Sequence, residues 1–258
     1  TLTFTGLVGS ETLGQTVGST FDNKNVGSNK TVTVNSITLG NGSNGGLAAN
    51  YSISAGQTTT ADITAKALTV SGITASNKMY DGNTVATLSS SNVTYSGIVS
   101  GDSFAGSFSG SFSDKNIGTG KTVTITSSYS GSDVSNYTVT DQSSTTANIT
   151  SRDLEVTGIT VFGLTVNNKE YDGTVTAPLK TDNISYSGLV EGDDFTGSYS
   201  GVFANANVGN GKTVTITSSY SGADAGNYTV TNQSSATGNI VPKVCLLYTS
   251  PSPRDDQT

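Results

Sequence analysis

The 258-residue chain carries a formal net charge of −7, contains no His and no Trp, and has a single Cys near its C-terminus. Without His, a Ser-His-Asp triad, a His-ligated zinc site and an imidazole general base are excluded. Its 12 Lys and Arg residues are scattered, which argues against nucleic-acid binding, and no apolar run approaches the roughly 20 residues of a membrane-spanning helix. We therefore expect no enzyme, no cofactor, no metal and no membrane insertion.

Internal repeats organise the chain. The segment KTVTITSSYSG occurs at residues 121–131 and again, unchanged, at residues 212–222, an offset of 91 residues. A third copy lies upstream, because Val26, Ile117 and Val208 step by the same 91 residues. A repeat of this length is too long for a solenoid unit and matches a small domain with its own core.

The recurring segment that joins the repeats sets the predicted boundaries. We expect a first repeat at residues 1–66 that is truncated at its start, a second at 67–152 and a third at 153–244. The joining segments are short and lack Gly-Ser runs, which favours stiff end-to-end docking over a flexible tether.

Within each repeat the hydrophobic pattern has a period of two. In residues 121–128, Val123 and Ile125 alternate with Thr, which predicts a strand with one buried face. Phe104, Phe108 and Phe112 are spaced four apart, so one strand would place all three on one face. Turn signals break the runs every 8–12 residues, and no segment has a convincing amphipathic helical pattern. The sequence predicts an all-β protein of tandem antiparallel, immunoglobulin-like β-sandwich domains, with β-grasp-like modules as the alternative.

Two tyrosines have the spacing of a tyrosine corner. Tyr228 follows Asp224 and Gly226 in the layout Asp-x-Gly-x-Tyr, and Tyr137 keeps the spacing to Asp133. In such a corner the tyrosine hydroxyl bonds back to the backbone a few residues upstream. This pattern predicts a structural role for Tyr137 and Tyr228.

The chain resembles the YDG repeat family. The resemblance lies in NKMYDG (77–82), NKEYDG (168–173), SDKNIGTGKTV (113–123) and GADAGNYTVT (222–231), and it extends over essentially all of residues 1–244. This family builds stalks in very large bacterial surface proteins of the filamentous-haemagglutinin type. The resemblance implies a secreted adhesin segment at the outer surface of a Gram-negative bacterium, and it brings no catalytic residues.

The motif that gives the family its name has two interpretations. Tyr80, Asp81 and Gly82, with their counterparts Tyr171, Asp172 and Gly173, could form a ligand-contacting loop. We favour a structural motif in which Asp-Gly makes a tight turn with positive φ at the Gly while the Tyr ring packs.

Two further residue groups suggest chemistry. Asp193 and Asp194 with Glu191 nearby could bind Ca²⁺, but no DxDxDG-like loop is present, and a solvated acidic loop is favoured. Lysines, asparagines and aspartates that recur in register could form an intramolecular isopeptide bond, although a solvated lysine at a strand start is the ordinary outcome. These residues are Lys30, Lys121 and Lys212; Asn50, Asn136 and Asn227; and Asp81 and Asp172.

The leading functional hypothesis is a structural stalk whose partners are the neighbouring repeats. Other parts of the parent protein would then contact a glycan or a host matrix. Alternatively the repeats themselves bind glycan or matrix, with tyrosines as the aromatic platform in the absence of Trp. The candidates for such a platform are Tyr95, Tyr129, Tyr186 and Tyr220.

The C-terminal segment departs from the repeat pattern. Residues 245–255 resemble a translated sequencing adapter, so we expect residues 245–258 to be a non-native tail, with a genuine disordered tail as the alternative.

Overall fold

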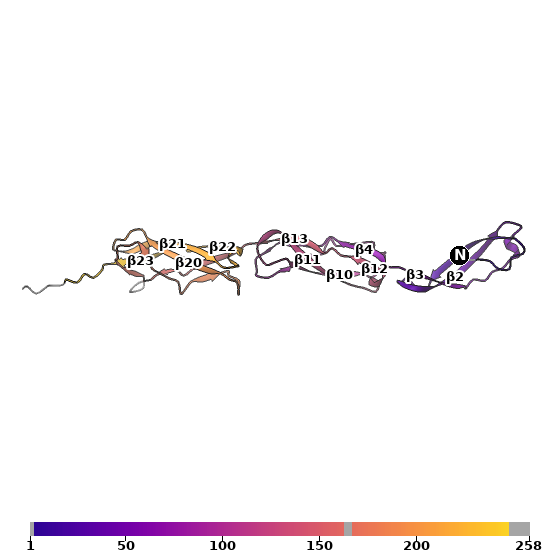
Figure 1. Cartoon of the computed structure of the whole chain (residues 1–258), viewed down its shortest axis with the longest axis horizontal. Helices are drawn as coiled ribbons and strands as arrows, with labels where there is room; N and C mark the ends of the chain where they lie inside the picture. The colour runs from indigo at the N-terminus through magenta and orange to yellow at the C-terminus, as the bar shows by residue number, and fades with distance from the viewer. Residues whose placement is uncertain (1–2, 163–166, 248–258) are drawn as a thin grey trace, which may run out of the picture. The chain divides into compact units, whose positions relative to one another are not determined.

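The computed structural model describes residues 3–162 and 167–247, and within them the chain is all-β (Figure 1). The described residues form strands and three short 3₁₀ turns, η1 (Ala48–Asn50), η2 (Val134–Asn136) and η3 (Ala225–Asn227), without an α-helix. Within these ranges there is no helix of the length and apolarity that a bilayer crossing requires. The predicted all-β class is confirmed.

The first repeat contains one antiparallel sheet. Its strands are β1 (Leu13–Phe21), β2 (Gly27–Asn41) and β3 (Thr58–Ile63), in the order β1-β2-β3. The register between β1 and β2 shifts between Gly18 and Ser19. This bulge adds one residue to β2, so Val34 and Ile37, three apart in sequence, both turn toward the less exposed face.

The second repeat contains ten strands in three sheets. The sheet orders are β6-β13-β11-β10-β7, β12-β4-β9 and β5-β8. The strands are β4 (Lys66–Ser71), β5 (Thr74–Ala75), β6 (Lys78–Met79), β7 (Val85–Ala86), β8 (Leu88–Ser89), β9 (Thr94–Ser96), β10 (Ala105–Phe112), β11 (Gly118–Ser130), β12 (Tyr137–Thr140) and β13 (Ser144–Thr150).

The described part of the third repeat has the same topology. Its sheet orders are β16-β23-β21-β20-β17, β19-β14-β22 and β15-β18. The strands are β14 (Arg152–Thr157), β15 (Thr160–Val161), β16 (Asn168–Glu170), β17 (Thr176–Ala177), β18 (Leu179–Lys180), β19 (Ser185–Ser187), β20 (Thr196–Phe203), β21 (Gly209–Ser221), β22 (Tyr228–Thr231) and β23 (Ser235–Val241).

The three-stranded and five-stranded sheets of the second and third repeats are mixed rather than purely antiparallel. Most pairs are antiparallel as predicted, but β4 pairs with β12, β6 with β13, β14 with β22, and β16 with β23 in parallel. Each parallel pair joins strands about 70 residues apart, since parallel strands need a long crossover connection. A pattern of local turn signals predicts only hairpins, so it could not reveal these pairs.

In the second repeat, the hydrophobic core lies between the sheet β12-β4-β9 and the five-stranded sheet that contains β11. In the second repeat, Leu68 and Val70 of β4 and Tyr137 of β12 pack with Ile125 of β11. Half-buried aromatic residues pack against this cluster, namely Tyr95, Phe104, Phe108 and Tyr129. The alternation along β10 leaves Phe108 and Phe112 on its less exposed face, so the predicted strand is confirmed for these two residues, whereas Phe104 lies just before β10 begins at Ala105.

The third repeat has a separate core cluster. It is formed by Val161, Ala177, Phe203, Val214 and Ile240, five buried side chains from β15, β17, β20, β21 and β23. Leu154 and Val156 of β14 are also buried, each about 1% exposed. The alternating residues of the repeated KTVTIT segment therefore face a core, while its threonines face solvent.

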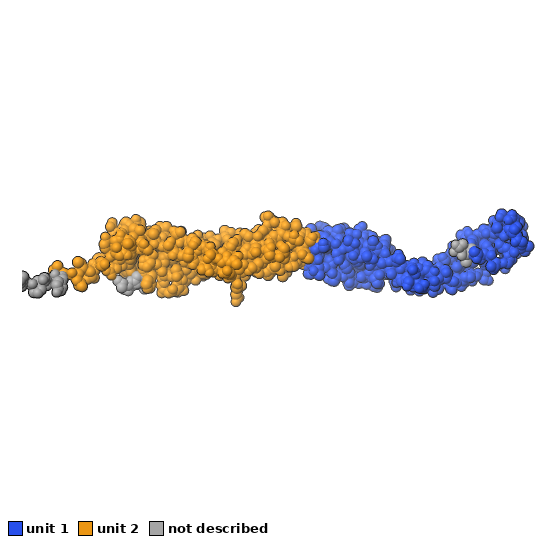
Figure 2. Space-filling view, viewed as in Figure 1, with its two compact units in different colours: residues 1–74, 88–109, 125–143 blue, residues 75–87, 110–124, 144–258 orange. Residues whose placement is uncertain are grey.

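The chain divides into two compact units whose border runs through the second repeat (Figure 2). One unit comprises residues 1–74, 88–109 and 125–143, and the other residues 75–87, 110–124 and 144–258. The predicted domain boundaries at 1–66, 67–152 and 153–244 stay predictions. Of the predicted non-native tail at 245–258, residues 248–258 lie outside the described residues.

We expect Leu154→Ala to destabilise the protein by about 2–5 kcal/mol, because it removes a buried side chain next to β22 and leaves a cavity. Val208→Ala is the matched control, since Val208 is about half exposed and lies outside the strands. Urea unfolding followed by circular dichroism measures both changes. Equal losses in the two variants would contradict the assignment of Leu154 to the core.

Candidate functional site

The most concentrated polar cluster joins the second and third repeats. The Lys115 Nζ atom lies 2.7 Å from Asp224 Oδ1 and 3.1 Å from Asp193 Oδ1. The two carboxylates are buried, with side chains about 10% and 3% exposed, whereas the lysine side chain is about one-third exposed. Only 12% of the chain's residues are charged, so three charged side chains in contact make this cluster a candidate functional site.

A turn between β10 and β11 presents Lys115. The Asp114 carboxylate accepts the Asn116 backbone N–H at 2.8 Å, which closes an Asx turn around the lysine. Lys121 then binds the same Asp114 carboxylate oxygen at 2.6 Å. The recurring lysine at the start of β11 therefore holds the turn that projects Lys115.

Two tyrosines complete the cluster. The Tyr80 and Tyr228 hydroxyls both donate to Asp193 Oδ2, at 2.8 and 2.5 Å. Their rings meet edge to face, with centroids 5.5 Å apart. Tyr80 is fully buried, although it belongs to the second repeat and its partners belong to the third.

An asparagine adds a contact to the backbone. Asn227 Oδ1 accepts the Ile117 N–H at 3.0 Å, and its Nδ2 group donates to Asn116 Oδ1 at 3.1 Å. Asn227 is only 3% exposed, because its side chain packs and hydrogen-bonds against the preceding repeat. We call the set Tyr80, Lys115, Ile117, Asp193, Asp224, Asn227 and Tyr228 the second junction.

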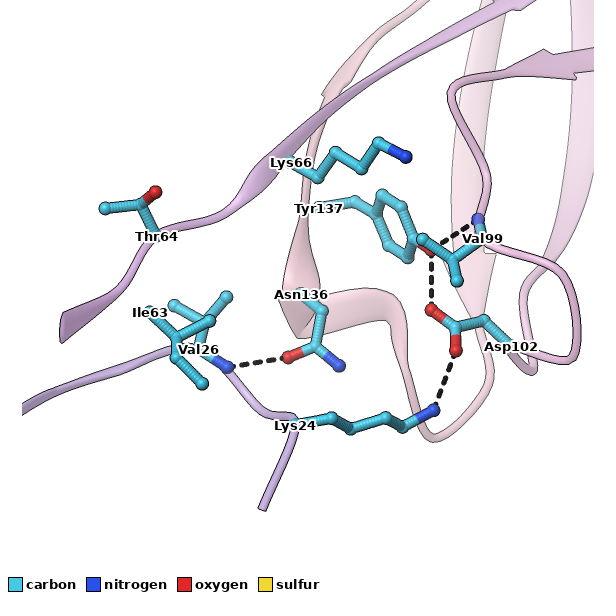
Figure 3. Close-up of a pocket in the computed structure, with 9 residues that line it drawn as sticks. All are labelled: Lys24, Val26, Ile63, Thr64, Lys66, Val99, Asp102, Asn136 and Tyr137. Atoms are coloured by element: carbon cyan, nitrogen blue, oxygen red, sulfur yellow. Dashed lines mark hydrogen bonds and ion pairs between the residues drawn. The ribbon is translucent and has the colours of Figure 1, made fainter. Parts of the chain in front are cut away.

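The same arrangement joins the first and second repeats (Figure 3). Lys24 Nζ lies 2.7 Å from both Asp102 Oδ1 and Asp133 Oδ1, and the Tyr137 hydroxyl donates to Asp102. Asn136 Oδ1 accepts the Val26 N–H at 2.9 Å. We call Lys24, Val26, Asp102, Asp133, Asn136 and Tyr137 the first junction; each residue lies 91 positions before its counterpart in the second.

The ion pairs shift the pKa values of the side chains that form them. The Lys115 ammonium and the Asp194 backbone N–H lower the pKa of Asp224, and the two carboxylates raise the pKa of Lys115. Lys24 likewise lowers the pKa of Asp102 and of Asp133. Burial, with Asp193 as neighbour, raises the pKa of Tyr80 and of Tyr228 to about 12.

The Tyr-Asp-Gly motifs form the turns that the sequence predicts. Gly82 and Gly173 have φ values of 78° and 80°. Asp81 pairs with Lys78 at 2.7 Å, and Asp172 pairs with Lys169 at 2.9 Å.

The two motifs differ in what covers their tyrosines. Tyr80 is buried at the second junction, whereas Tyr171 is 42% exposed. A Cβ on Gly82 would lie 2.8 Å from Val190 of the third repeat, while one on Gly173 would meet nothing.

The predicted tyrosine corners take a different form. The Tyr137 hydroxyl accepts the Val99 N–H at 2.9 Å, and the Tyr228 hydroxyl accepts the Val190 N–H at 2.9 Å. These backbone groups lie 38 residues upstream, not the few residues of a local corner. Each tyrosine instead ties the loop before β10 or β20 to the start of β12 or β22.

The residues of the isopeptide hypothesis do not converge. Lys121 binds Asp114, Asp81 binds Lys78, and Asn136 binds Val26 of the preceding repeat. Lys30 pairs with Asp22 at 3.2 Å, and Lys212 donates to Asn205 Oδ1 at 2.5 Å. Each lysine of this series holds the turn before its own strand.

The acidic segment around Asp193 contributes to the second junction rather than to an open loop. The Asp193 carboxylate contacts Lys115, Tyr80 and Tyr228. Asp194 Oδ2 accepts the Ala223 N–H at 2.9 Å. In the described ranges, no three His, Cys, Asp or Glu side chains gather closely enough to hold a metal ion.

The tyrosines of the proposed glycan platform are half-buried against phenylalanines. Tyr95 and Tyr129 pack on Phe104, with ring centroids 5.3 and 5.1 Å away. Tyr186 and Tyr220 pack on Phe195 in the same way, at 5.6 and 5.2 Å. Tyr95 belongs to β9 and Tyr186 to β19, and each packs against the phenylalanine of its own repeat.

Sequence reasoning missed the lysines of the junctions. Lys24 and Lys115 recur at the 91-residue offset, as do the carboxylates that they bind, and this recurrence of rare charges was a signal available in the sequence. The third repeat has Ala206 at the lysine position, so it lacks this ion pair. The first repeat keeps Glu11, which accepts the Tyr51 hydroxyl, but has Leu47 in place of the second carboxylate.

We expect Tyr80→Ala to destabilise the chain by about 3–5 kcal/mol, because it empties a fully buried position and leaves Asp193 with one phenol donor fewer. Tyr171→Ala, the same change at an exposed counterpart, should stay within about 0.5 kcal/mol. Guanidinium unfolding measures the loss of unfolding free energy in each variant. Similar losses in the two variants would contradict a stabilising role for the burial of Tyr80 at the second junction.

Acid should weaken the second junction. The pKa of Asp224 is lowered in the folded chain, so its stabilisation is complete above the unfolded value of about 3.9 and is lost as pH falls through the lower folded value. Lys115→Met removes the main cause and should therefore lose less stability on acidification than the unchanged chain. Unfolding free energies measured from pH 6 down to pH 2 test this, with the exposed Lys180→Met as control. An unchanged pH profile in Lys115→Met would contradict the assignment.

A comparison with protein families identifies the repeats. The profile of the YDG domain matches three times in tandem, at residues 1–61, 64–147 and 155–237. Neither the comparison with curated proteins nor that with solved structures finds a match. Since the three matches cover most of the 258 residues, the chain belongs to the YDG domain family.

Proposed function

We propose that this chain is a structural spacer, a stalk segment of a large secreted bacterial surface adhesin of the filamentous-haemagglutinin type. Its partners are the neighbouring repeats, and the contact with a glycan or a host matrix is made by other parts of the parent protein. In this role the repeats hold a binding region away from the outer membrane, and they need no catalytic site.

The observation that carries the proposal is the repeated junction. Six residues of the first junction recur in the second with the same contacts, so successive repeats dock in one defined way. A lysine between two buried carboxylates resists separation of the repeats, because separation leaves the two carboxylates close together without their cation. A spacer needs such a defined contact between repeats.

The connecting segments support the same role. One residue, Ser151, separates β13 from β14, and two residues separate β3 from β4. The Ser151 hydroxyl lies 2.8 Å from the Thr229 hydroxyl, which fixes this connection further. Each of these strands is paired inside its own repeat, so connections this short leave one repeat little freedom to bend against the next.

Glycan binding by the repeats themselves has less support. The four tyrosines that would serve as a platform pack on Phe104 and Phe195 and are half-buried. The spacer function is therefore the one that the geometry favours.

Spin labels on the first two repeats test the spacer. With Cys245→Ser, the exposed pair Thr16→Cys and Ser109→Cys should give a narrow distance distribution by double electron–electron resonance. Lys24→Ala combined with Asn136→Ala should broaden it, because the two ion pairs of Lys24 and the hydrogen bond from Val26 to Asn136 are lost. Lys180→Ala, an exposed lysine outside both junctions, should leave it unchanged. A broad distance distribution in the spin-labelled chain whose first junction is intact would overturn the proposal.

A further inference from the structure

The second junction brings an amine, two carboxyl groups and two phenols into contact within one compact unit. The Lys115 Nζ atom lies 3.1 Å from Asp193 Oδ1 and 2.7 Å from Asp224 Oδ1. The Tyr80 and Tyr228 hydroxyls both donate to the other oxygen of Asp193, Oδ2. A nucleophile on one side of a carboxyl group, with hydrogen-bond donors on its second oxygen and a base nearby, is the arrangement of acyl-transfer chemistry.

Asp193 is placed as the group that an amine attacks. Its side chain is 3% exposed, and its Oδ2 atom accepts the two phenols at 2.8 and 2.5 Å. Such donors stabilise the negative charge that develops on an oxygen when a nucleophile adds to the adjacent carbon. Both donors are held in place, because the Tyr80 ring is fully buried and the Tyr228 hydroxyl also accepts the Val190 N–H at 2.9 Å. Oδ1, the oxygen that faces the lysine, is therefore the one that leaves.

Asp224 is placed to carry protons. Its Oδ1 atom is the carboxylate oxygen closest to the ammonium. Its Oδ2 atom accepts the Asp194 N–H at 3.0 Å, and the Asp224 N–H donates to the Asp194 carbonyl at 3.1 Å, so the carboxylate has a fixed orientation. Hydrogen-bond reach of the proton to be moved is the first requirement of a general base.

Docking of the two repeats brings the amine to this site. The Asx turn that Asp114 forms with Asn116 presents Lys115, and Asn227 accepts the Ile117 N–H at 3.0 Å. Holding two reactants in contact raises their effective concentration far above any attainable in solution. The lysine side chain is about one-third exposed, so a small product has a path from the site to solvent.

We infer that the second junction forms an amide bond between Lys115 Nζ and Asp193 Cγ, with Asp224 as the proton carrier. Asp224 takes a proton from the ammonium, and the neutral amine adds to Cγ while charge passes to Oδ2. Asp224 then transfers protons to Oδ1, the bond from Cγ to Oδ1 breaks, and Oδ1 leaves as water. Of the three ammonium protons, two leave in this water and one stays on the amide nitrogen, so the step requires no oxidant or cofactor.

The product keeps the hydrogen bonds of the site. The amide oxygen is the former Oδ2 atom, which still accepts both phenols, and the amide N–H faces Asp224, whose carboxylate is restored. The ion-paired junction is the state from which the bond forms. Lys115 differs from the lysines of the sequence-based isopeptide hypothesis, since it lies on the turn before β11 and the bond joins two repeats. The inference rests on this geometry and not on the spacer function.

Mass spectrometry of the full chain tests the bond. After the folded chain has been kept at neutral pH for several days, protease digestion should give a linked peptide that contains Lys115 and Asp193. Its mass should be that of the two separate peptides less one water. Lys115→Arg keeps the positive charge without the amine and should give no linked peptide, whereas Lys180→Arg, at an exposed lysine outside both junctions, should give as much as the unchanged chain. Circular dichroism verifies that each variant is folded.

Two further variants separate the roles of the carboxyl groups. Asp193→Asn keeps the carbon that is attacked but changes the leaving group, so it should give the same linked peptide with release of ammonia instead of water. Asp224→Asn keeps the shape of the side chain but removes the proton acceptor, and it should lower the rate of linkage at least about tenfold. A purely structural role of Asp224 would leave the rate unchanged in a folded variant.

Three results would overturn the inference. The first is a folded, unchanged chain without the linked peptide. The second is a bond from Lys115 to Asp224, because the attacked carbon would then be the wrong one. The third is an equal rate of linkage in Asp224→Asn and the unchanged chain. The spin-label distances that test the spacer concern the first junction, so the failure of one proposal is distinguishable from the failure of the other.

Discussion

The contact between successive repeats depends on a lysine held between two buried carboxylates. Asp193 and Asp224 are almost fully covered, and a pair of carboxylates removed from water is costly unless a cation compensates it. The compensating ammonium comes from the preceding repeat, on a turn that Asp114 and Lys121 hold in place. The second and third repeats thus each contain a pair of carboxylates that is compensated only when the preceding repeat is docked, which makes the contact specific as well as attractive.

The junction also uses groups that have a role inside each repeat. Tyr137 and Tyr228 tie a loop to the core and at the same time donate to the carboxylate that receives the lysine. Because the core and the junction share these tyrosines, folding of a repeat positions its receptor for the next lysine. The two exceptions, Ala206 in the third repeat and Leu47 in the first, change the side chains that make the ion pair and leave the tyrosine position intact.

The Tyr-Asp-Gly motif has a local part and a tertiary part. Its turn is local, since the positive φ of the glycine and the Lys–Asp pair three residues apart recur in both complete repeats. The environment of its tyrosine is not local. Tyr80 is fully buried where a following repeat covers it, and Tyr171 remains exposed. The burial of this tyrosine is therefore a tertiary property, which the residues of the motif do not set by themselves.

The sequence by itself determined the all-β class, the 91-residue repetition, the turn at each Tyr-Asp-Gly motif and the strand that carries Phe108 and Phe112. These features follow from short-range patterns: a period of two, turn residues and exact recurrence. Only the tertiary structure decided the parallel pairs such as β6 with β13, the place of Tyr80 and the partners of Lys24 and Lys115. Those contacts join residues about 70 to 140 positions apart, and no local pattern encodes which of several equivalent tyrosines or carboxylates lies opposite a given lysine.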